Sequence, residues 1–81
     1  LLWFRKGFCF NALGRYSEAV TCFDQALNIN PMSDTYYFDK GYSLHLLGKY
    51  VEAVECYEGV IRLNPRNDLA WNNKAFSLQF L

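Results

Sequence analysis

The chain carries three cysteines and one histidine, the residue types that most often form metal sites and nucleophile–base pairs. A structural zinc site needs a set of four such ligands, and no close cysteine or second histidine accompanies His45. No carboxylate or nucleophile is placed in the sequence to use it. We therefore expect no metal site, and we interpret His45 as an ordinary exposed or half-buried residue.

Other arrangements that carry chemistry are missing from the sequence. It has no paired carboxylates in a plausible pocket, no glycine-rich phosphate loop and no nucleophile with a base at a recognisable spacing. We therefore expect no catalytic residues, no enzyme activity and no cofactor in this segment. Eight basic and eight acidic residues are interspersed and cancel, which argues against a nucleic-acid partner. No apolar run approaches the roughly 20 residues of a membrane span, so neither a signal peptide nor a membrane anchor is expected.

What remains is the chemistry of contact surfaces, because 52% of the residues are apolar and 19% are aromatic. This composition excludes a disordered chain. A set of positions recurs after a constant interval of 34 residues, as from Trp3 to Tyr37 and from Pro31 to Pro65. The first copy of the pattern contains Trp3, Gly7, Gly14, Tyr16, Ala19, Phe23, Ala26 and Pro31, and the second contains Tyr37, Gly41, Gly48, Tyr50, Ala53, Tyr57, Val60 and Pro65. Such self-similarity predicts a repeat array whose units bury their apolar faces by stacking.

Each unit is predicted to contain two helices. The second helix of each unit carries one apolar stripe, formed by Ala19, Val20, Phe23, Ala26 and Leu27 and by Ala53, Val54, Tyr57, Val60 and Ile61. Gly14 and Gly48 should end the first helix of each unit, and Pro31 and Pro65 the second. Side-chain caps are expected from Ser33, Asp34, Asn67 and Asp68. The predicted helices cover residues 2–13, 16–29, 35–47, 50–63 and 69–81.

Glycines inside the predicted helices indicate close packing. Gly7 and Gly41 would let the two antiparallel helices of a unit approach closely, while Phe23 and Tyr57 fill the space beside them. Gly59 has no explanation at the level of sequence, because a glycine inside a helix costs about 1 kcal/mol relative to alanine.

Charged residues are interpreted as solvated. Lys6, Lys40 and Lys74 recur at the interval of the repeat and are expected to form an exposed rim. Glu58 and Arg62 are spaced for an ion pair along one helix.

Two of the cysteines, Cys22 and Cys56, are separated by the same interval and should occupy equivalent faces as small apolar side chains. Reduced thiols and a cytoplasmic protein are expected on this ground.

The order of Trp3, Gly7, Phe10, Gly14, Tyr16, Ala19, Phe23, Ala26 and Pro31 resembles the tetratricopeptide repeat (TPR) family, and the segment from Tyr37 to Pro65 resembles it again. The resemblance implies an all-α fold of five helices, in which antiparallel helix pairs stack as a right-handed superhelix. It divides the single array 1–81 into a first repeat at 1–33, a second at 34–67 and the first helix of a third at 68–81. Because the pattern stops inside this third copy, we expect the segment to belong to a longer protein.

The resemblance also implies a concave groove, lined by the first helix of each pair, that binds a peptide or a partner protein without catalysis. The groove positions carried over from the family are Phe4, Arg5, Phe8, Asn11, Phe38, Asp39, Tyr42, His45, Asn72, Asn73, Phe76 and Gln79. Members that grip the terminal carboxylate of heat-shock chaperones use lysines, asparagines and an arginine. The corresponding positions here hold Phe4 and Phe8, then Asp39, then Leu69 and Asn73, so that clamp is absent.

Two alternatives stay open at this stage. The groove aromatics could instead pack one helix on the next, and Arg5 and Asp39 could merely neutralise one another. The array could also act as a structural spacer, or self-associate into a homo-oligomer through Trp71, Phe76 and Phe80 on the last helix.

Overall fold

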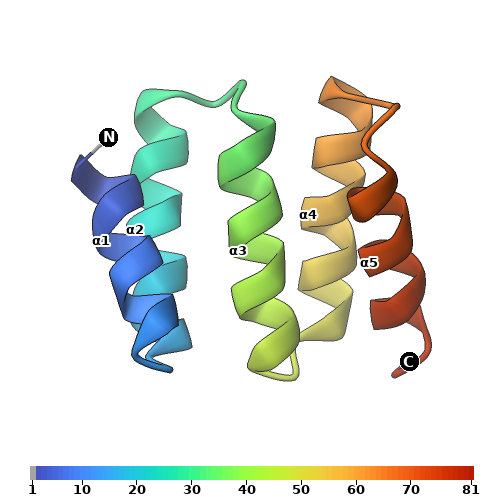
Figure 1. Cartoon of the computed structure of the whole chain (residues 1–81), viewed down its shortest axis with the longest axis horizontal. Coiled ribbons are helices and arrows are strands. Elements are labelled where there is room, and N and C mark those ends of the chain that lie inside the picture. The colour runs from blue at the N-terminus through green and yellow to red at the C-terminus, as the bar shows by residue number, and fades with distance from the viewer. Residues whose placement is uncertain (1) are drawn as a thin grey trace.

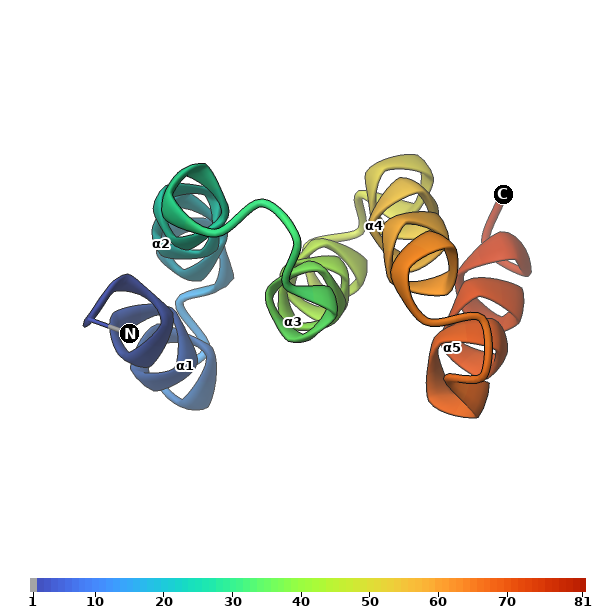
Figure 2. The same ribbon diagram turned by 90° about the horizontal axis from the view of Figure 1, so that it is seen from above.

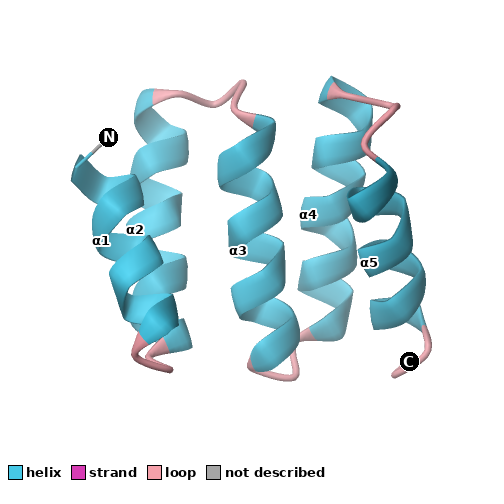
Figure 3. Ribbon diagram, in the orientation of Figure 1, coloured by secondary structure: helices cyan, strands magenta, loops and turns pink. Residues whose placement is uncertain are grey.

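The computed structural model describes residues 2–81, and within that range every regular element is an α-helix (Figures 1 and 3). In chain order the helices are α1 (Leu2–Ala12), α2 (Tyr16–Ile29), α3 (Asp34–Leu46), α4 (Tyr50–Leu63) and α5 (Asp68–Leu78). Each helix runs antiparallel to the next and packs against it, so that the five stand in a row (Figure 1). The expected all-α array of stacked helix pairs is confirmed.

The helices form two layers. Seen from above, α1, α3 and α5 lie on one side of the stack, and α2 and α4 lie on the other (Figure 2). The middle helix of the first layer, α3, is set back between α1 and α5. The stack measures 30 × 24 × 16 Å, so its longest axis runs from repeat to repeat.

The helix ends follow the chemistry expected from the sequence. Gly14 and Gly48 adopt left-handed backbone conformations with φ of 77° and 81°, which glycine tolerates because it has no Cβ. The side chain of Ser33 accepts the Tyr36 N–H at the start of α3, and that of Asn67 caps α5 in the same way. The predicted bounds of three helices differ from the structure by one to three residues: α1 ends at residue 12 rather than 13, α3 covers 34–46 rather than 35–47, and α5 covers 68–78 rather than 69–81.

The core lies between the two layers. The apolar stripes of α2 and α4 supply its most buried members, which are Ala19, Phe23, Ala26, Ala53, Tyr57 and Val60. Gly7 and Gly41 face the rings of Phe23 and Tyr57 as predicted, because a Cβ placed at either glycine would lie within 3.0 Å of the ring. The buried Gly59 faces the Tyr37 ring, and a Cβ there would stand 3.3 Å from it, a looser contact than at Gly7 or Gly41.

Ion pairs join the layers where one repeat meets the next. Lys40 Nζ on α3 lies 2.6 Å from the Asp24 carboxylate on α2, and Lys74 Nζ on α5 lies 3.3 Å from Glu58 on α4. The interpretation of these lysines as a merely solvated rim was therefore wrong. The expected pair between Glu58 and Arg62 does not form, because the Glu58 carboxylate turns toward Lys74 on the neighbouring helix.

Candidate binding groove

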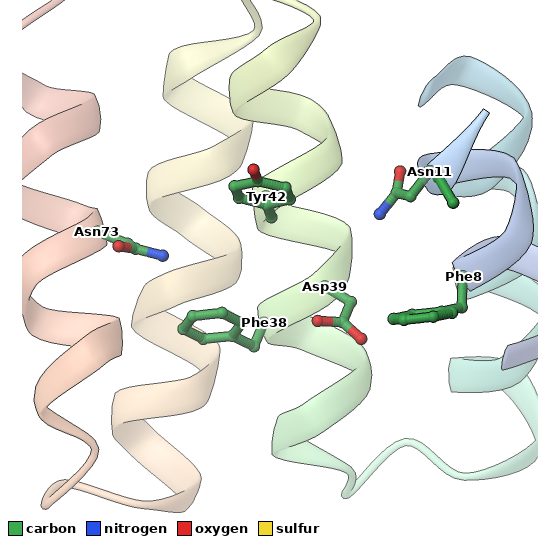
Figure 4. A pocket seen from close by; sticks show the side chains of 7 residues that line it. Phe8, Asn11, Phe38, Asp39, Tyr42 and Asn73 are labelled. Atoms are coloured by element: carbon green, nitrogen blue, oxygen red, sulfur yellow. The ribbon is translucent and has the colours of Figure 1, made fainter. Parts of the chain in front are cut away.

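A hollow of about 410 Å³ opens on the face formed by α1, α3 and α5 (Figure 4). Its walls are Phe8, Asn11 and Ala12 from α1, Phe38, Asp39 and Tyr42 from α3, and Asn73 from α5. The recessed position of α3 makes it the floor, while α1 and α5 form the sides (Figures 2 and 4). We call this hollow the groove. Of its seven lining residues, only Ala12 was not among the predicted groove positions.

Three aromatic rings line the groove: Phe8, Phe38 and Tyr42. Phe8 is 61% exposed and Tyr42 is 48% exposed, so both present large apolar area to solvent. Phe38 is held more tightly, because its ring meets the buried Tyr57 ring edge-on at 5.7 Å between centroids. Burial raises the pKa of Tyr57 to about 12, so its hydroxyl stays protonated and neutral within the core. The groove therefore combines one fixed ring, Phe38, with two accessible rings, Tyr42 on its floor and Phe8 on its side.

Two amides face the groove from opposite sides (Figure 4). The Asn11 side chain is oriented by Ser43, whose fully buried hydroxyl donates a 2.6 Å hydrogen bond to Asn11 Oδ1. This bond uses the amide oxygen and leaves the amide nitrogen free to donate. Asn73 projects from α5 toward the groove, and a hydrogen bond from its side chain to the buried Tyr57 hydroxyl acts against the effect of burial on the Tyr57 pKa. The free amide N–H of Asn11 can bind a carbonyl group of an extended peptide.

Asp39 is the charged residue of the groove. Its carboxylate lies beside the Phe8 ring (Figure 4), and burial raises its pKa above the usual range. The suggested neutralisation by Arg5 does not occur: Arg5 lines a separate hollow on another side of α1, together with Trp3 and Lys6.

A smaller cavity of about 160 Å³ adjoins the groove between α3, α4 and α5 and shares Tyr42 and Asn73 with it. His45 and Phe76, both predicted groove positions, line this cavity. A 2.8 Å hydrogen bond joins His45 Nδ1 to the buried Ser77 hydroxyl. The His45 ring also packs within about 5 Å of the Tyr50, Phe76 and Phe80 rings. His45 thus has a packing role that the sequence did not indicate.

Four of the predicted groove residues lie elsewhere. Phe4 packs between repeats, with ring centroids 4.9 Å from Tyr36 and 5.7 Å from Phe23, which is the structural role considered as an alternative. Arg5 belongs to the separate hollow described above. Asn72 and Gln79 are exposed on and just after α5, outside the groove and the adjoining cavity.

The residues expected to mediate self-association do not form one patch. Phe76 and Phe80 pack against each other, with Phe80 stacked on Tyr50 at 4.7 Å between centroids. Trp71 lies apart: its indole N–H donates to the Pro65 carbonyl at 2.9 Å, and Lys74 sits over its ring. Each of the three is still about half exposed, so each remains available for contact.

Serines 43 and 77 were overlooked at the level of sequence. Both are fully buried, and each bonds a polar side chain on the preceding repeat, Ser43 to Asn11 and Ser77 to His45. Their recurrence at the interval of the repeat was the signal that could have found them. Two equivalent hydrogen bonds therefore connect α1 to α3 and α3 to α5.

The described residues offer little for chemistry beyond binding. Burial raises the pKa of Cys56 to about 11, so its thiol stays protonated near neutral pH. A protonated thiol is a weak nucleophile, because the thiolate is the reactive form. Within residues 2–81, no cluster of three or more His, Cys, Asp or Glu side chains could hold a metal ion. None of the helices in this range combines the length and the apolar character needed to cross a bilayer.

Solved structures with the same fold were found at low sequence identity. The crystal structure of the Sgt2 TPR domain from Aspergillus fumigatus matches 96% of this chain with a TM-score of 0.91 and 23% identity. MamA AMB-1 matches 90% with a TM-score of 0.84 and 25% identity, and a chain of the CopN–Scc3 complex matches 96% with 0.82 and 18%. The present chain spans 52%, 40% and 54% of those three chains.

Family models give the assignment at the level of sequence. The model described as "Tetratricopeptide repeat" matches residues 1–33, and the model described as "TPR repeat" matches residues 41–79. A search of curated proteins found no significant match. The recurring sequence pattern, the stacked helix pairs and the two family models show that the chain belongs to the tetratricopeptide repeat family.

Proposed function

We propose that this chain is a non-catalytic interaction module that holds a peptide segment or a partner protein in the groove between α1, α3 and α5. TPR repeats generally mediate protein–protein interaction, and this family and fold are typically scaffolds rather than enzymes. The observation that carries the proposal is the hollow of about 410 Å³ with Phe8 and Tyr42 exposed among its lining residues.

The physical case rests on the cost of leaving this surface in water. Aromatic rings bury large contact areas with few rotatable bonds, so a ligand that covers them gains affinity at low entropic cost. The groove volume lies within the range of about 300–1,000 Å³ seen for ligand pockets. The amide nitrogen of Asn11 adds a directional donor on one side, and the Asn73 amide faces the groove from the other. Apolar anchors between hydrogen-bonding sides suit an extended segment with apolar side chains.

The test uses a phage-displayed library of short random peptides selected on the wild-type chain. The affinity of the best synthetic peptide is then measured by calorimetry for wild type, for Phe8→Ala/Tyr42→Ala and for Ile29→Ala. Ile29 is 74% exposed on α2 and serves as the control for loss of apolar surface outside the groove. We expect the groove variant to lose at least about tenfold in affinity and the control to retain it. Equal affinities with unchanged helical circular dichroism would refute groove binding.

Self-association is the second candidate, because six large apolar side chains on and after α5 are exposed: Leu69, Trp71, Phe76, Leu78, Phe80 and Leu81. Large apolar side chains left exposed on one terminal helix are candidates for a contact site, although they do not form a single patch here. Light scattering over a concentration series would reveal a homo-oligomer as a rising mass, and Trp71→Ala/Phe80→Ala should then restore the monomer. A mass that stays monomeric at every concentration would exclude this candidate.

We further propose that residues 1–81 form one continuous array, with repeats at 1–33, 34–67 and 68–81. The three cysteines are free, and two of them are buried, which supports a reducing compartment such as the cytoplasm.

A further inference from the structure

Asp39 is a carboxylate without a counter-ion inside an otherwise neutral groove. Aromatic rings and amides surround it, and within residues 2–81 no ion pair or side-chain hydrogen bond reaches its carboxylate oxygens. It is half-buried, and burial raises its pKa. A charge that has lost part of its hydration is unfavourable until a cation or a hydrogen-bond donor replaces the lost water. Asp39 is therefore a carboxylate that a ligand could stabilise.

The lysines of the neighbouring helix faces do not meet this need. Lys40, next to Asp39 in the sequence, points to the opposite layer and pairs with Asp24. Lys74 pairs with Glu58 in the same way, and Arg5 lines a hollow on another side of α1. The groove consequently carries negative charge, and the cations on its own helices are directed elsewhere.

A second acid extends the negative charge along α3. A cavity of about 200 Å³ adjoins the groove at the first turn of this helix, and Phe38 and Asp39 belong to both hollows. The other residues lining it are Asp34, Thr35, Asn67 and Leu69. Asp34 accepts the Thr35 N–H at 2.9 Å, but among the described residues no lysine or arginine lines either hollow. Two carboxylates with no lysine or arginine among the lining residues therefore favour a positively charged ligand along this face of α3.

We propose that the groove selects a peptide segment in which a lysine or arginine side chain reaches Asp39 while a neighbouring apolar side chain packs on Phe8 and Tyr42. The inference rests on the groove binding proposed above and adds its chemical specificity. The aromatic faces beside the carboxylate favour the same ligand, because a cation over a ring gains a further attraction. The hydrogen bond from a cation to a carboxylate is also shorter and stronger than a neutral one.

The same charge excludes another class of ligand. A free carboxylate placed near Asp39 would meet like charge at a partly desolvated site, which disfavours its binding. An acidic segment, or a chain end whose terminal carboxylate must enter the groove, is therefore rejected. Specificity in this groove comes from a repulsive element as well as an attractive one.

The experiment compares the peptides selected by wild type with those selected by Asp39→Asn, which removes the charge and keeps the shape of the side chain. Glu55→Gln is the matched control, because Glu55 is an exposed acid on α4 outside the groove. We expect wild type to enrich peptides with Lys or Arg beside an aromatic or aliphatic residue. The best of them should bind Asp39→Asn about tenfold or more weakly and bind Glu55→Gln unchanged. Its affinity for wild type should fall with added salt more steeply than its affinity for Asp39→Asn.

The outcomes separate this inference from the function on which it rests. If peptides bind and the Phe8→Ala/Tyr42→Ala variant abolishes binding, but the sequences show no basic preference or Asp39→Asn binds equally well, the role of Asp39 is overturned and groove binding stands. If no peptide is selected, or if the groove variant binds as well as wild type, both proposals fail. If light scattering shows a dimer that forms with rising concentration and that Phe8→Ala/Tyr42→Ala abolishes, the groove is occupied by a second copy of the chain, and the inference about Asp39 is overturned.

Discussion

Substitution of Gly7, Gly41 or Gly59 by alanine adds one methyl group at a helix contact, and the loss of stability should be largest where the contact is closest. At Gly7 the new Cβ would stand 2.6 Å from Phe23 Cε1, far inside the roughly 3.5–4.0 Å of an ordinary carbon contact. Phe23 is fully buried, so its ring cannot swing away into solvent. At Gly41 the distances are 2.9 Å to Tyr57 Cε1 and 3.1 Å to Cys56 Cβ, and at Gly59 the nearest atom is 3.3 Å away on Tyr37.

The expected free energies follow from two opposing effects. Overpacking of a well-packed site costs about 1–3 kcal/mol, whereas alanine is favoured over glycine inside a helix by about 1 kcal/mol. With the overpacking near its upper limit, Gly7→Ala should lose about 2 kcal/mol of stability. Gly41→Ala should lose about 0.5–1 kcal/mol, because its closest contact is less severe. Gly59→Ala should be neutral or gain about 0.5 kcal/mol, because Tyr37 is only half-buried and can shift by a few tenths of an ångström.

Urea unfolding followed by circular dichroism measures all three differences. For a chain of this size, each kcal/mol corresponds to about 4–8 °C in Tm, so thermal melts would resolve Gly7→Ala from the other two variants. Gly14→Ala is the control for backbone strain without crowding, since φ is +77° there and no atom lies within 4 Å of the added Cβ. A Gly7→Ala variant as stable as wild type, or a Gly59→Ala variant less stable than Gly7→Ala, would refute the packing argument.

Three further perturbations have expected outcomes. Asp39→Asn should raise the stability of the fold near neutral pH, because the raised pKa of Asp39 means that its ionised carboxylate is less favourable in the folded chain than in the unfolded chain. As the pH falls toward 3.8, the pKa of Asp39 in the unfolded chain, the carboxylate becomes protonated and the gain in stability from the substitution should vanish. Denaturant melts of both proteins at pH 7 and pH 3 measure this difference. Ser33→Ala should lose about 1 kcal/mol by removing the cap of α3, whereas Ser17→Ala, an exposed change inside α2, should lose none in the same melts. Lys40→Met keeps most of the aliphatic stem and should lose at most about 1 kcal/mol through the missing ion pair with Asp24, a loss that should shrink in molar salt.

Local rules were sufficient to predict the helices, because each boundary has its own chemical cause within a few residues. Gly14 and Gly48 close helices through their backbone freedom, and Ser33 and Asn67 open them through their side chains. The end of α5 was wrong because its last residues form turns with i to i+3 hydrogen bonds, as from the Phe80 N–H to the Ser77 carbonyl, and nothing in their types marks that change.

The positions around the groove could be predicted in part, through the resemblance to the family. The positions carried over from the family include Phe8, Asn11, Asp39 and Tyr42, which the structure brings together because helical spacing puts each pair on one face of its helix. Which of two adjacent sides of a helix faces the groove depends on how the repeats are staggered, and spacing within one helix does not contain that information. Arg5, carried over in the same way, lines a separate hollow on another side of α1.

Contacts across the junctions were missed for a related reason. The periodicity of α3 shows that Lys40 lies off the apolar stripe but not which residue the neighbouring helix presents to it. A signal was available, since Asp24 precedes Lys40 by the same interval in sequence as Glu58 precedes Lys74. A comparison of each acidic residue with the basic residues of the next repeat, rather than of its own helix, would have predicted both ion pairs.

The matching of these junctions bears on how such a chain can grow. If residues 34–67 were duplicated in tandem, Glu58 of the first copy would face Lys40 of the second at the spacing seen for Lys74, and His45 would face Ser43 as it now faces Ser77. The inserted unit would meet both neighbours with the same ion pair and the same polar contact. Each junction is therefore interchangeable with the next, so a change in gene length by whole units preserves the interfaces. Arrays built on this rule can acquire or lose binding surface without redesigning their core.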